Sequence, residues 1–224
     1  MDLDRPPDIV VVAGGEPVAP GLVLDVPPSA RVVAADSGVD LARSLGWRVD
    51  LAVGDFDSIS AAGRDAIDDS DAEVRVHPVA KDATDLELAL EAAVEVAARP
   101  DVGGRVLVVG LEGGRPDHAL ANLLVAAADR FAVIDIELVL AQGRAWVVRD
   151  ELVGDLPPGR VLSLVPVHGA ATVSVTGVRW GLECSSLDAG TTRGVSNQTS
   201  GGPLTITVHD GTVLCITPRT HEIS

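Results

Sequence analysis

The sequence predicts an α/β domain followed by a smaller all-β domain. Between Ile9 and about Ala141, apolar strand-like runs alternate with helical patterns. This alternation is typical of a mostly parallel sheet with helices on its faces. After Gln142, short strands separated by Gly, Pro and Asp turns follow one another, and no convincing helix remains. Such spacing is typical of a small antiparallel β-sandwich.

The first part has a regular order of elements. Short runs rich in Val, Ile and Leu predict strands, and apolar residues at helical spacing predict helices. The predicted strands are residues 9–13, 31–35, 51–53, 105–110 and 133–140, and the predicted helices are residues 39–45, 85–98 and 119–128. This order indicates a Rossmann-like α/β domain over residues 1–141.

The second part consists of strands alone. They are predicted at residues 144–149, 161–165, 171–175, 203–208 and 212–216. We therefore expect an all-β domain over residues 142–224.

Charge and composition exclude several classes of protein. The formal net charge is −16 over 224 residues. A general nucleic-acid binder needs a basic face, so this class is excluded. Small phosphates remain compatible with the chain if a divalent cation lies between them and the carboxylates. The two cysteines, Cys184 and Cys215, lack the spacing of a zinc site.

The N-terminus is acidic and broken by proline, unlike a signal peptide, and no apolar run approaches the length of a membrane span. We therefore expect a cytoplasmic protein with no membrane partner.

Polar clusters follow three of the predicted strands at their carboxyl ends, where open α/β sheets bind ligands. Asp36-Ser37-Gly38 follows the strand at residues 31–35. Gly54-Asp55-Phe56-Asp57-Ser58 follows the strand at residues 51–53. The third cluster, Gly113-Gly114-Arg115-Pro116-Asp117-His118, comes after the strand at residues 105–110.

Asp55 and Asp57 stand two residues apart, so an extended or tightly turned backbone brings their carboxylates together. Like charges at short distance repel unless one is protonated or a cation lies between them. Magnesium binds proteins through one or two carboxylates and completes its coordination with substrate phosphates. The alternative is a surface turn in which the Asp and Ser side chains hydrogen-bond their own backbone.

The segment Lys81-Asp82-Ala83-Thr84-Asp85 leads into the helix predicted at residues 85–98. One interpretation is structural, because Thr84 is a good N-cap and acidic residues suit the first turn of a helix. The other is functional, because a helix N-terminus presents free amides to an anion and Asp85 adds a third carboxylate. Lys81 is the only lysine in the sequence, and a lysine ammonium suits a phosphate contact.

The third cluster combines flexible glycine backbone, a guanidinium and a proline suited to the first turn of a helix. Arg115 suits a nucleotide phosphate, and Asp117 suits an amino group on an acceptor ring. Asn122 lies one helical turn after His118, on the same face. A capped helix with a surface arginine is the structural alternative. The sequence contains neither a Walker A motif nor GxGxxG, so a nucleotide would depend on carboxylate-held magnesium and helix termini.

Taken together and in this order, the clusters resemble the motifs of the thiamine pyrophosphokinase family. The matching segments are residues 35–38, 54–58, 81–85, 113–118, 177–182 and 194–197, and the resemblance covers roughly residues 8–216. It implies an α/β catalytic domain, a β-sandwich that helps to bind thiamine, and a homodimer with active sites between subunits. It also implies ATP as the diphosphate donor and AMP as a product.

The resemblance assigns a role to residues at matching positions. The magnesium and phosphate site is assigned to Asp55, Asp57 and Asp85, and the nucleotide contacts to Asp36, Lys81, Thr84, Arg115 and Asn122. Asp117, Ser196 and Asn197 are assigned to thiamine.

Two features of the β part have alternative interpretations. Trp180 is expected to pack in the core, and the alternative is stacking on a cationic ring. Ser196-Asn197 equally suits a hairpin turn.

We therefore expect a magnesium-dependent thiamine diphosphokinase, in which the hydroxyethyl oxygen of thiamine attacks the β-phosphorus of ATP. Positioning and charge neutralisation dominate such transfers. One rival is diphosphate transfer to another heterocyclic alcohol, such as 6-hydroxymethylpterin. The other is a non-catalytic nucleotide or vitamin sensor of the same fold. The release of AMP with each acceptor separates these alternatives.

Overall fold

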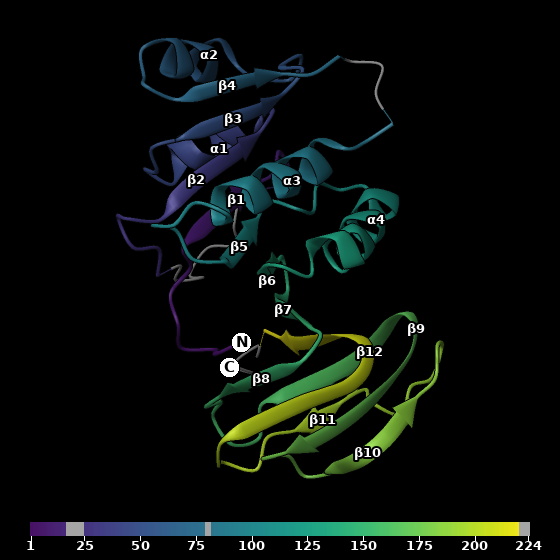
Figure 1. Ribbon diagram of the computed structural model, residues 1–224. Helices are drawn as coiled ribbons and strands as arrows, with labels where there is room; N and C mark the ends of the chain where they lie inside the picture. Colours follow the sequence, from purple (N-terminus) through teal and green to yellow (C-terminus); the bar gives the residue numbers. More distant parts are fainter. Residues whose placement is uncertain (17–24, 79–81, 220–224) are drawn as a thin grey trace, which may run out of the picture. The chain divides into compact units, whose positions relative to one another are not determined.

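The computed structural model describes residues 1–16, 25–78 and 82–219, which Figure 1 traces along the chain. They form two compact units. The α/β unit comprises Pro6–Ala126 and Ile136–Ala141. The β unit comprises Met1–Arg5, Ala127–Asp135 and the chain from Gln142 onward. The predicted fold class, an α/β part followed by an antiparallel β part, is confirmed.

The two compact units are each made of segments that alternate along the chain. A single boundary after Ala141, as predicted from the sequence, therefore does not separate them. The backbone N of Leu3 donates to the carbonyl of Val153 at 2.8 Å, so the N-terminus pairs with the β unit. The guanidinium of Arg149 donates to the carbonyl of Ala128 at 3.0 Å and holds the segment after the last helix to the same unit. The division of functions between residues 1–141 and 142–224 stays a prediction.

The α/β unit is built on one sheet with the strand order β6-β5-β1-β2-β3-β4. The pairs β5–β1, β1–β2, β2–β3 and β3–β4 are all parallel. All of these strands except β4 are buried along all or most of their length, which explains their continuous Val, Leu and Ala composition. The strands are β1 (Ile9–Val12), β2 (Arg31–Ala35), β3 (Leu51–Gly54), β4 (Glu73–Val76), β5 (Arg105–Val109) and β6 (Asp135–Leu140).

Helices cover this sheet. Helix α1 (Gly38–Ser44) buries Val39 and Leu41 in a core cluster that also contains alternate residues of β1 and β2. Helix α3 (Asp85–Ala97) contacts β1, β2 and β3 with a separate set of buried residues and covers the face of the sheet opposite to α1 (Figure 1). Helix α4 (Pro116–Ala126) follows β5, and a short 3-10 helix, Asp129–Phe131, comes after it.

Two elements at one edge of the sheet were not predicted. Helix α2 (Ala61–Asp68) is short and buries only Gly63 and Ile67. Strand β4 is an edge strand with a largely exposed sequence, Glu-Val-Arg-Val. Both are short and largely exposed, so they lack the long apolar runs by which the other elements were predicted, and both form because they pair with or cover the neighbouring structure.

The β unit is antiparallel, and two long bent strands organise it. One arm of β9 (Val161–Thr176) and one arm of β12 (Leu204–Pro218) pair with each other and with β7 (Gly143–Val148) and β11 (Asn197–Gln198). The other arms pair with each other and with β8 (Glu151–Gly154) and β10 (Leu182–Leu187). Residues from both sets of arms share one core, as in a β-sandwich.

The bends in β9 and β12 explain why the sequence predicted four separate strands where the structure has two. In β9, even-numbered residues from Leu162 are buried before the bend and odd-numbered residues from Ala171 are buried after it. The exposed segment between these arms includes His168, which has a φ of 61°. A bend that changes the buried phase lets one strand serve two sheets.

Within the part of the chain that the structure describes, none of the helices has the length and apolar character needed to cross a bilayer.

Candidate active site

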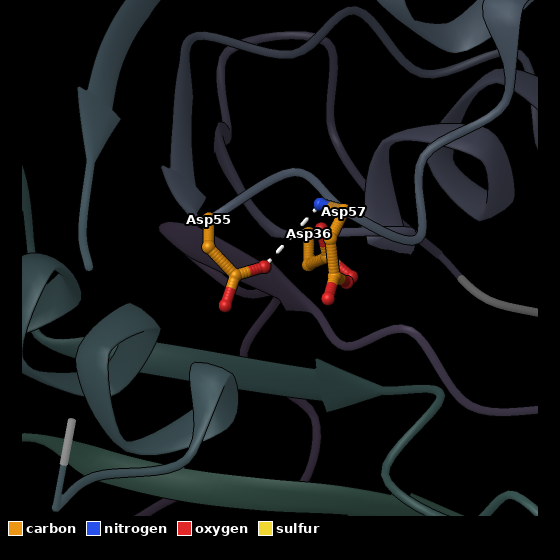
Figure 2. Close-up of side chains that lie close together, drawn as sticks. All are labelled: Asp36, Asp55 and Asp57. Carbon is orange, nitrogen blue, oxygen red and sulfur yellow. Dashed lines mark hydrogen bonds between the residues drawn. The ribbon is translucent and has the colours of Figure 1, made fainter. Parts of the chain in front are cut away.

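Three carboxylates meet at the carboxyl end of the parallel sheet. Asp36 follows β2, and Asp55 and Asp57 follow the neighbouring strand β3. One carboxylate oxygen of each lies within 4.8 Å of the others, and Figure 2 shows the three side chains around a common space. Among the described residues, this is the one group of three or more His, Cys, Asp or Glu side chains close enough to hold a metal ion.

Asp36 is the buried member of this cluster. The residue is 7% exposed, and its Oδ1 atom has no hydrogen-bond partner among the described residues. Burial is the largest cause that raises the pKa of Asp36, and a backbone hydrogen bond from Ser37 opposes it. The negative charges of Asp85, Asp55 and Asp57 raise this pKa further. A cation at the cluster would favour the ionised form and offset this repulsion.

The backbone after β2 and β3 brings these acids together. Asp36 has a φ of 46°, a conformation that aspartate adopts more readily than most residues. Gly54 ends β3 with a φ of 146°. A Cβ atom at position 54 would lie 3.2 Å from the Cβ of Asp36, so glycine permits both the conformation and the close approach.

Phe56 lies at the centre of the turn that carries the other two acids. Its φ of 59° is unusual for an aromatic residue and costs about 1–2 kcal/mol. Its side chain is buried in the core under the sheet. The backbone N of Asp57 donates to Oδ1 of Asp55 at 3.3 Å, and Ser58 Oγ donates to Asp57 at 2.7 Å. The turn therefore makes local hydrogen bonds and gathers the carboxylates as well.

A cavity of about 300 Å³ opens beside Asp36 at the same edge of the sheet. Segments that follow β1, β2 and β5 line it, together with the first turns of α3 and α4. The residues predicted from the sequence that line it are Asp36, Thr84, Asp85, Arg115 and Asn122. Five site residues from three parts of the chain, after β2, at the start of α3 and around α4, thus line one cavity.

The sequence analysis missed Gly14 and Gly15, which also line this cavity. A Cβ atom on Gly15 would lie 2.2 Å from the carbonyl oxygen of Glu112, so glycine lets the chain after β1 pass the chain after β5. The signal was present in the sequence, because consecutive glycines just after an apolar strand indicate close backbone approach.

Thr84 and Asp85 begin α3 at the cavity. Thr84 is the N-cap, and its Oγ1 accepts a hydrogen bond from the backbone N of Glu87 at 3.2 Å. Asp85 raises the pKa of Asp36 but lies outside the group of three close carboxylates. The third member of the close group is Asp36, whereas the sequence led us to expect Asp85 beside Asp55 and Asp57. Asp36 lies near these two acids because β2 pairs directly with β3. Lys81, also predicted to contact the nucleotide, lies outside the described residues.

Arg115 and Asp117 form an exposed ion pair at the start of α4. Nε of Arg115 donates to Oδ1 of Asp117 at 3.2 Å, and its Nη2 donates to Oδ2 at 2.5 Å. The hydrogen bonds from Arg115 are the largest cause that lowers the pKa of Asp117 to about 2. Asn122 is buried, and its Nδ2 donates to the carbonyl of Leu111 at 2.7 Å, which anchors the loop after β5 at the cavity wall.

The residues predicted to face thiamine are divided between the two units. Asp117 belongs to the α/β unit, and Ser196 and Asn197 belong to the β unit. The side chain of Asn197 accepts from the backbone N of Trp180 at 3.1 Å and donates to its carbonyl at 2.7 Å. Asn197 thereby links β11 to the segment that contains Trp180.

Trp180 is 54% exposed, so its predicted place in the core was wrong. It lies just before β10, where Asn197 holds its backbone from the neighbouring segment. The guanidinium of Arg179 lies 4.7 Å from the centre of its ring.

A second cavity, of about 670 Å³, lies at the amino ends of β2 and β3. It contains the ion pair between Arg31 and Asp50, at 3.3 Å. Open α/β sheets bind ligands at the carboxyl ends of their strands, so we take the smaller cavity beside the three acids as the candidate active site.

Comparison with known proteins identifies the family. A family model described as Thiamin pyrophosphokinase, catalytic domain, matches residues 27–138, and another described as its vitamin B1 binding domain matches residues 150–213. The thiamine pyrophosphokinase of Bacillus subtilis (strain 168) is 28% identical over 202 residues, covering 85% of this chain and 88% of that protein.

Solved structures agree with this match. The crystal structure of thiamine pyrophosphokinase from Bacillus subtilis has a TM-score of 0.78 at 26% identity, covering 95% of this chain and 99% of that one. Thiamin pyrophosphokinase from Candida albicans has a TM-score of 0.76 at 12% identity, covering 95% of this chain and 89% of that one, and so shares the fold. Because the two matched regions together span both the α/β and the β parts, the chain belongs to the thiamin pyrophosphokinase family.

Proposed function

We propose that this protein transfers the diphosphate group of ATP to the hydroxyethyl group of thiamine, giving thiamine diphosphate and AMP. The observation that carries the proposal is the cluster of Asp36, Asp55 and Asp57 beside the cavity at the carboxyl end of the sheet. Three acids at this position account for a phosphate substrate only if a cation lies between them. Membership of the thiamin pyrophosphokinase family supports the choice of acceptor.

The cluster fits a magnesium ion by its chemistry. It offers three carboxylate oxygens within 4.8 Å of one another, and Oδ1 of Asp36 is buried without a hydrogen-bond partner among the described residues. Hard oxygen donors of this kind are the ones that magnesium prefers. We assign Asp36, Asp55 and Asp57 to the ion, with Asp85 at the adjoining cavity wall. When bound, magnesium neutralises phosphate charge and the charge that develops during transfer.

The residues around the cavity bind and orient the nucleotide. Gly14 and Gly15 let a phosphate approach the backbone closely, and the N-terminus of α3 lies at the cavity wall, where a helix dipole favours an anion. Arg115 adds a guanidinium at the cavity wall. In the proposed reaction, the thiamine hydroxyl oxygen forms a bond to the β-phosphorus, the bond from that phosphorus to the α,β-bridging oxygen breaks, and AMP leaves. The hydroxyl proton is released.

The acceptor is assigned to Asp117, Ser196 and Asn197 on the basis of the family resemblance. Asp117 is ionised at neutral pH, as an aspartate normally is, and Arg115 lowers its pKa further to about 2, so it can accept a hydrogen bond from an amino group of the vitamin. Asn197 holds the backbone of Trp180 in place, and the exposed Trp180 ring offers an aromatic surface to a cationic ring.

A homodimer with active sites between subunits is part of the proposal. On α4, directly after the Arg115–Asp117 pair, Leu120 is 60% exposed and Leu124 is 37% exposed. These side chains lie one helical turn apart, so they form an apolar stripe that a second copy can cover. Light scattering of the purified protein is expected to give twice the mass of one chain, and Leu120→Asp is expected to shift it toward the monomer.

The test of the reaction is direct. The protein is incubated with ATP, magnesium and thiamine, and AMP and thiamine diphosphate are quantified together. Equal amounts of the two products support the proposal. Controls replace thiamine with 6-hydroxymethylpterin or omit the acceptor. Release of AMP only with the pterin, formation of ADP with thiamine monophosphate, or binding of both substrates without turnover would each refute it.

A further inference from the structure

We propose that Arg64 is a positioning residue that orients the carboxylates of Asp55 and Asp57 for a divalent cation, an inference that rests on the magnesium site proposed above. Arg64 lies on α2, outside the cavity and outside the acidic cluster. Its Nη2 donates to the carbonyl oxygen of Phe56 at 2.8 Å. Phe56 stands between the two acids, so this contact reaches the middle of the turn.

The turn needs external support because its central residue is strained. Phe56 has a φ of 59°, a conformation that bulky residues rarely adopt. Such conformations persist when the surrounding structure fixes them at more than one point. The buried ring fixes one point, and Arg64 fixes the second through the carbonyl oxygen.

One peptide group connects Arg64 to both acids. The carbonyl of Phe56 and the N–H of Asp57 belong to the same planar unit and therefore rotate together. Arg64 donates to the oxygen of this peptide unit, and the N–H of the same unit donates to Oδ1 of Asp55 at 3.3 Å. Figure 2 shows this second hydrogen bond as a dashed line between Asp57 and Asp55. Rotation of the peptide would break the contact to Asp55 and turn the backbone that directs Asp57.

Helix α2 holds Arg64 in register with the turn. Ser60 is the N-cap of this helix, and its Oγ accepts from the backbone N of Gly63 at 3.0 Å. The backbone N and the Oγ of Ser60 donate to the carboxylate of Asp40 on α1, at 2.8 Å and 2.5 Å. Helix α1 packs on the sheet, so the position of Arg64 is set by the core of the unit.

The chemistry of arginine suits this role. Arg64 makes no salt bridge with any described residue, so a surface ion pair does not explain its placement. A guanidinium is always charged and forms stronger hydrogen bonds to a carbonyl than a neutral donor. A lysine offers a compact ammonium on a flexible stem, without the planar geometry of the guanidinium, and is expected to restore only part of the effect.

The test measures divalent binding apart from turnover. Binding of Mn²⁺ to the nucleotide-free protein is followed by electron paramagnetic resonance, and unfolding is followed in urea. The variants are Arg64→Ala, Arg64→Lys and Ile67→Ala, with Asp57→Asn to confirm that the signal reports the acidic cluster. Ile67 is a buried residue of the same helix and of the same core cluster as Phe56, so its truncation lowers stability but keeps the guanidinium that donates to Phe56.

Arg64→Ala is expected to raise the Kd for Mn²⁺ about tenfold, which corresponds to about 1.4 kcal/mol. Arg64→Lys is expected to recover part of this loss. Ile67→Ala is expected to lower the urea midpoint and leave the Kd within roughly twofold of the wild type, because the guanidinium of Arg64 is still present. The proposal is overturned if Arg64→Ala binds Mn²⁺ like the wild type, if Ile67→Ala weakens binding equally, or if the wild type binds no Mn²⁺.

The result is separable from the proposed reaction. If the wild type releases no AMP with thiamine while the Mn²⁺ series behaves as expected, the reaction is refuted and the role of Arg64 stands. If AMP is released normally and Arg64→Ala binds Mn²⁺ like the wild type, the reaction stands and the role of Arg64 is refuted.

Discussion

Gly54 lies directly against Asp36. A Cβ atom at position 54 would be 3.2 Å from both the Cβ and the backbone N of Asp36, and Gly54 itself has a φ of 146°. The last residue of β3 is thus in close contact with the acid that follows β2. This contact explains how a buried aspartate and the exposed turn after β3 come to share one site.

Gly54→Ala is expected to lower the free energy of unfolding by about 1–3 kcal/mol, the usual range for a residue forced into an unfavourable backbone conformation. It should also reduce turnover, because the added methyl group pushes Asp36 away from the other two acids. Urea unfolding and thiamine diphosphate formation measure the two effects. Gly46→Ala is the matched control, because Gly46 has a φ of 74° but only open space where the added methyl group would lie. Wild-type turnover by Gly54→Ala would contradict the role of this contact.

Asp36→Asn is expected to stabilise the protein at pH 7 in buffer without divalent ions, while reducing turnover. The pKa of Asp36 is raised in the folded state, chiefly by burial and also by the charges of the nearby acids. Between the pKa of an unfolded aspartate and the raised pKa of folded Asp36, the folded state therefore binds more protons than the unfolded state. The free energy of unfolding falls as the pH rises through this range. Asparagine has no charge at this pH, so the substitution removes this decrease in the free energy of unfolding.

Urea unfolding of Asp36→Asn and the wild type at pH 7 and about pH 4 checks this linkage, since 4 is near the pKa of an unfolded aspartate. The difference between them should shrink at the lower pH. Added magnesium should stabilise the wild type more than the variant. A variant less stable than the wild type at pH 7 without divalent ions would show that Asp36 is not held at an electrostatic cost.

Asp57→Asn is expected to reduce turnover by about a hundredfold or more, comparable to the loss of a preorganised electrostatic group. The substitution keeps the shape of the side chain and removes its charge. Steady-state rates at saturating magnesium and ATP provide the measurement. Asp68→Asn, at an exposed position on α2, is the matched control and should retain the wild-type rate. Near-normal turnover by Asp57→Asn would remove this residue from the site.

Arg115→Ala and Asp117→Ala are expected to affect substrate use more than stability. The two side chains are 65% and 62% exposed, and exposed ion pairs contribute little to folding. The lowered pKa of Asp117 adds stability at pH values above the pKa of an unfolded aspartate, but solvent screening keeps this contribution small for a pair so exposed. The urea midpoint at pH 7 should therefore change little in either variant.

The kinetic effects of these two substitutions should differ. Arg115→Ala is expected to raise the KM for ATP, and Asp117→Ala the KM for thiamine, in assays that vary one substrate at a time. Arg99→Ala, which removes another exposed arginine, should change neither constant. An identical effect of both variants on both substrates would mean that the pair acts only as a unit that orders the loop.

The order of apolar strands, helices and acidic loops was enough to predict the α/β sheet and the edge at which the acids gather. Asp36, Asp55 and Asp57 could be found because each follows a buried strand, and parallel strands bring their carboxyl ends to the same edge. The N-cap role of Thr84 was also predictable, because capping depends on residues close in sequence.

Long-range pairing decided the rest. That Asp36 joins Asp55 and Asp57, with Asp85 outside the close group, follows from the register of β2 against β3, in which Ala35 lies opposite Val53. The bends that merge four predicted strands into β9 and β12, and the exposure of Trp180, also depend on contacts between distant segments. Local patterns specify which residues prefer to be buried or to turn, whereas the partners that bury or expose them are set only when the chain closes on itself.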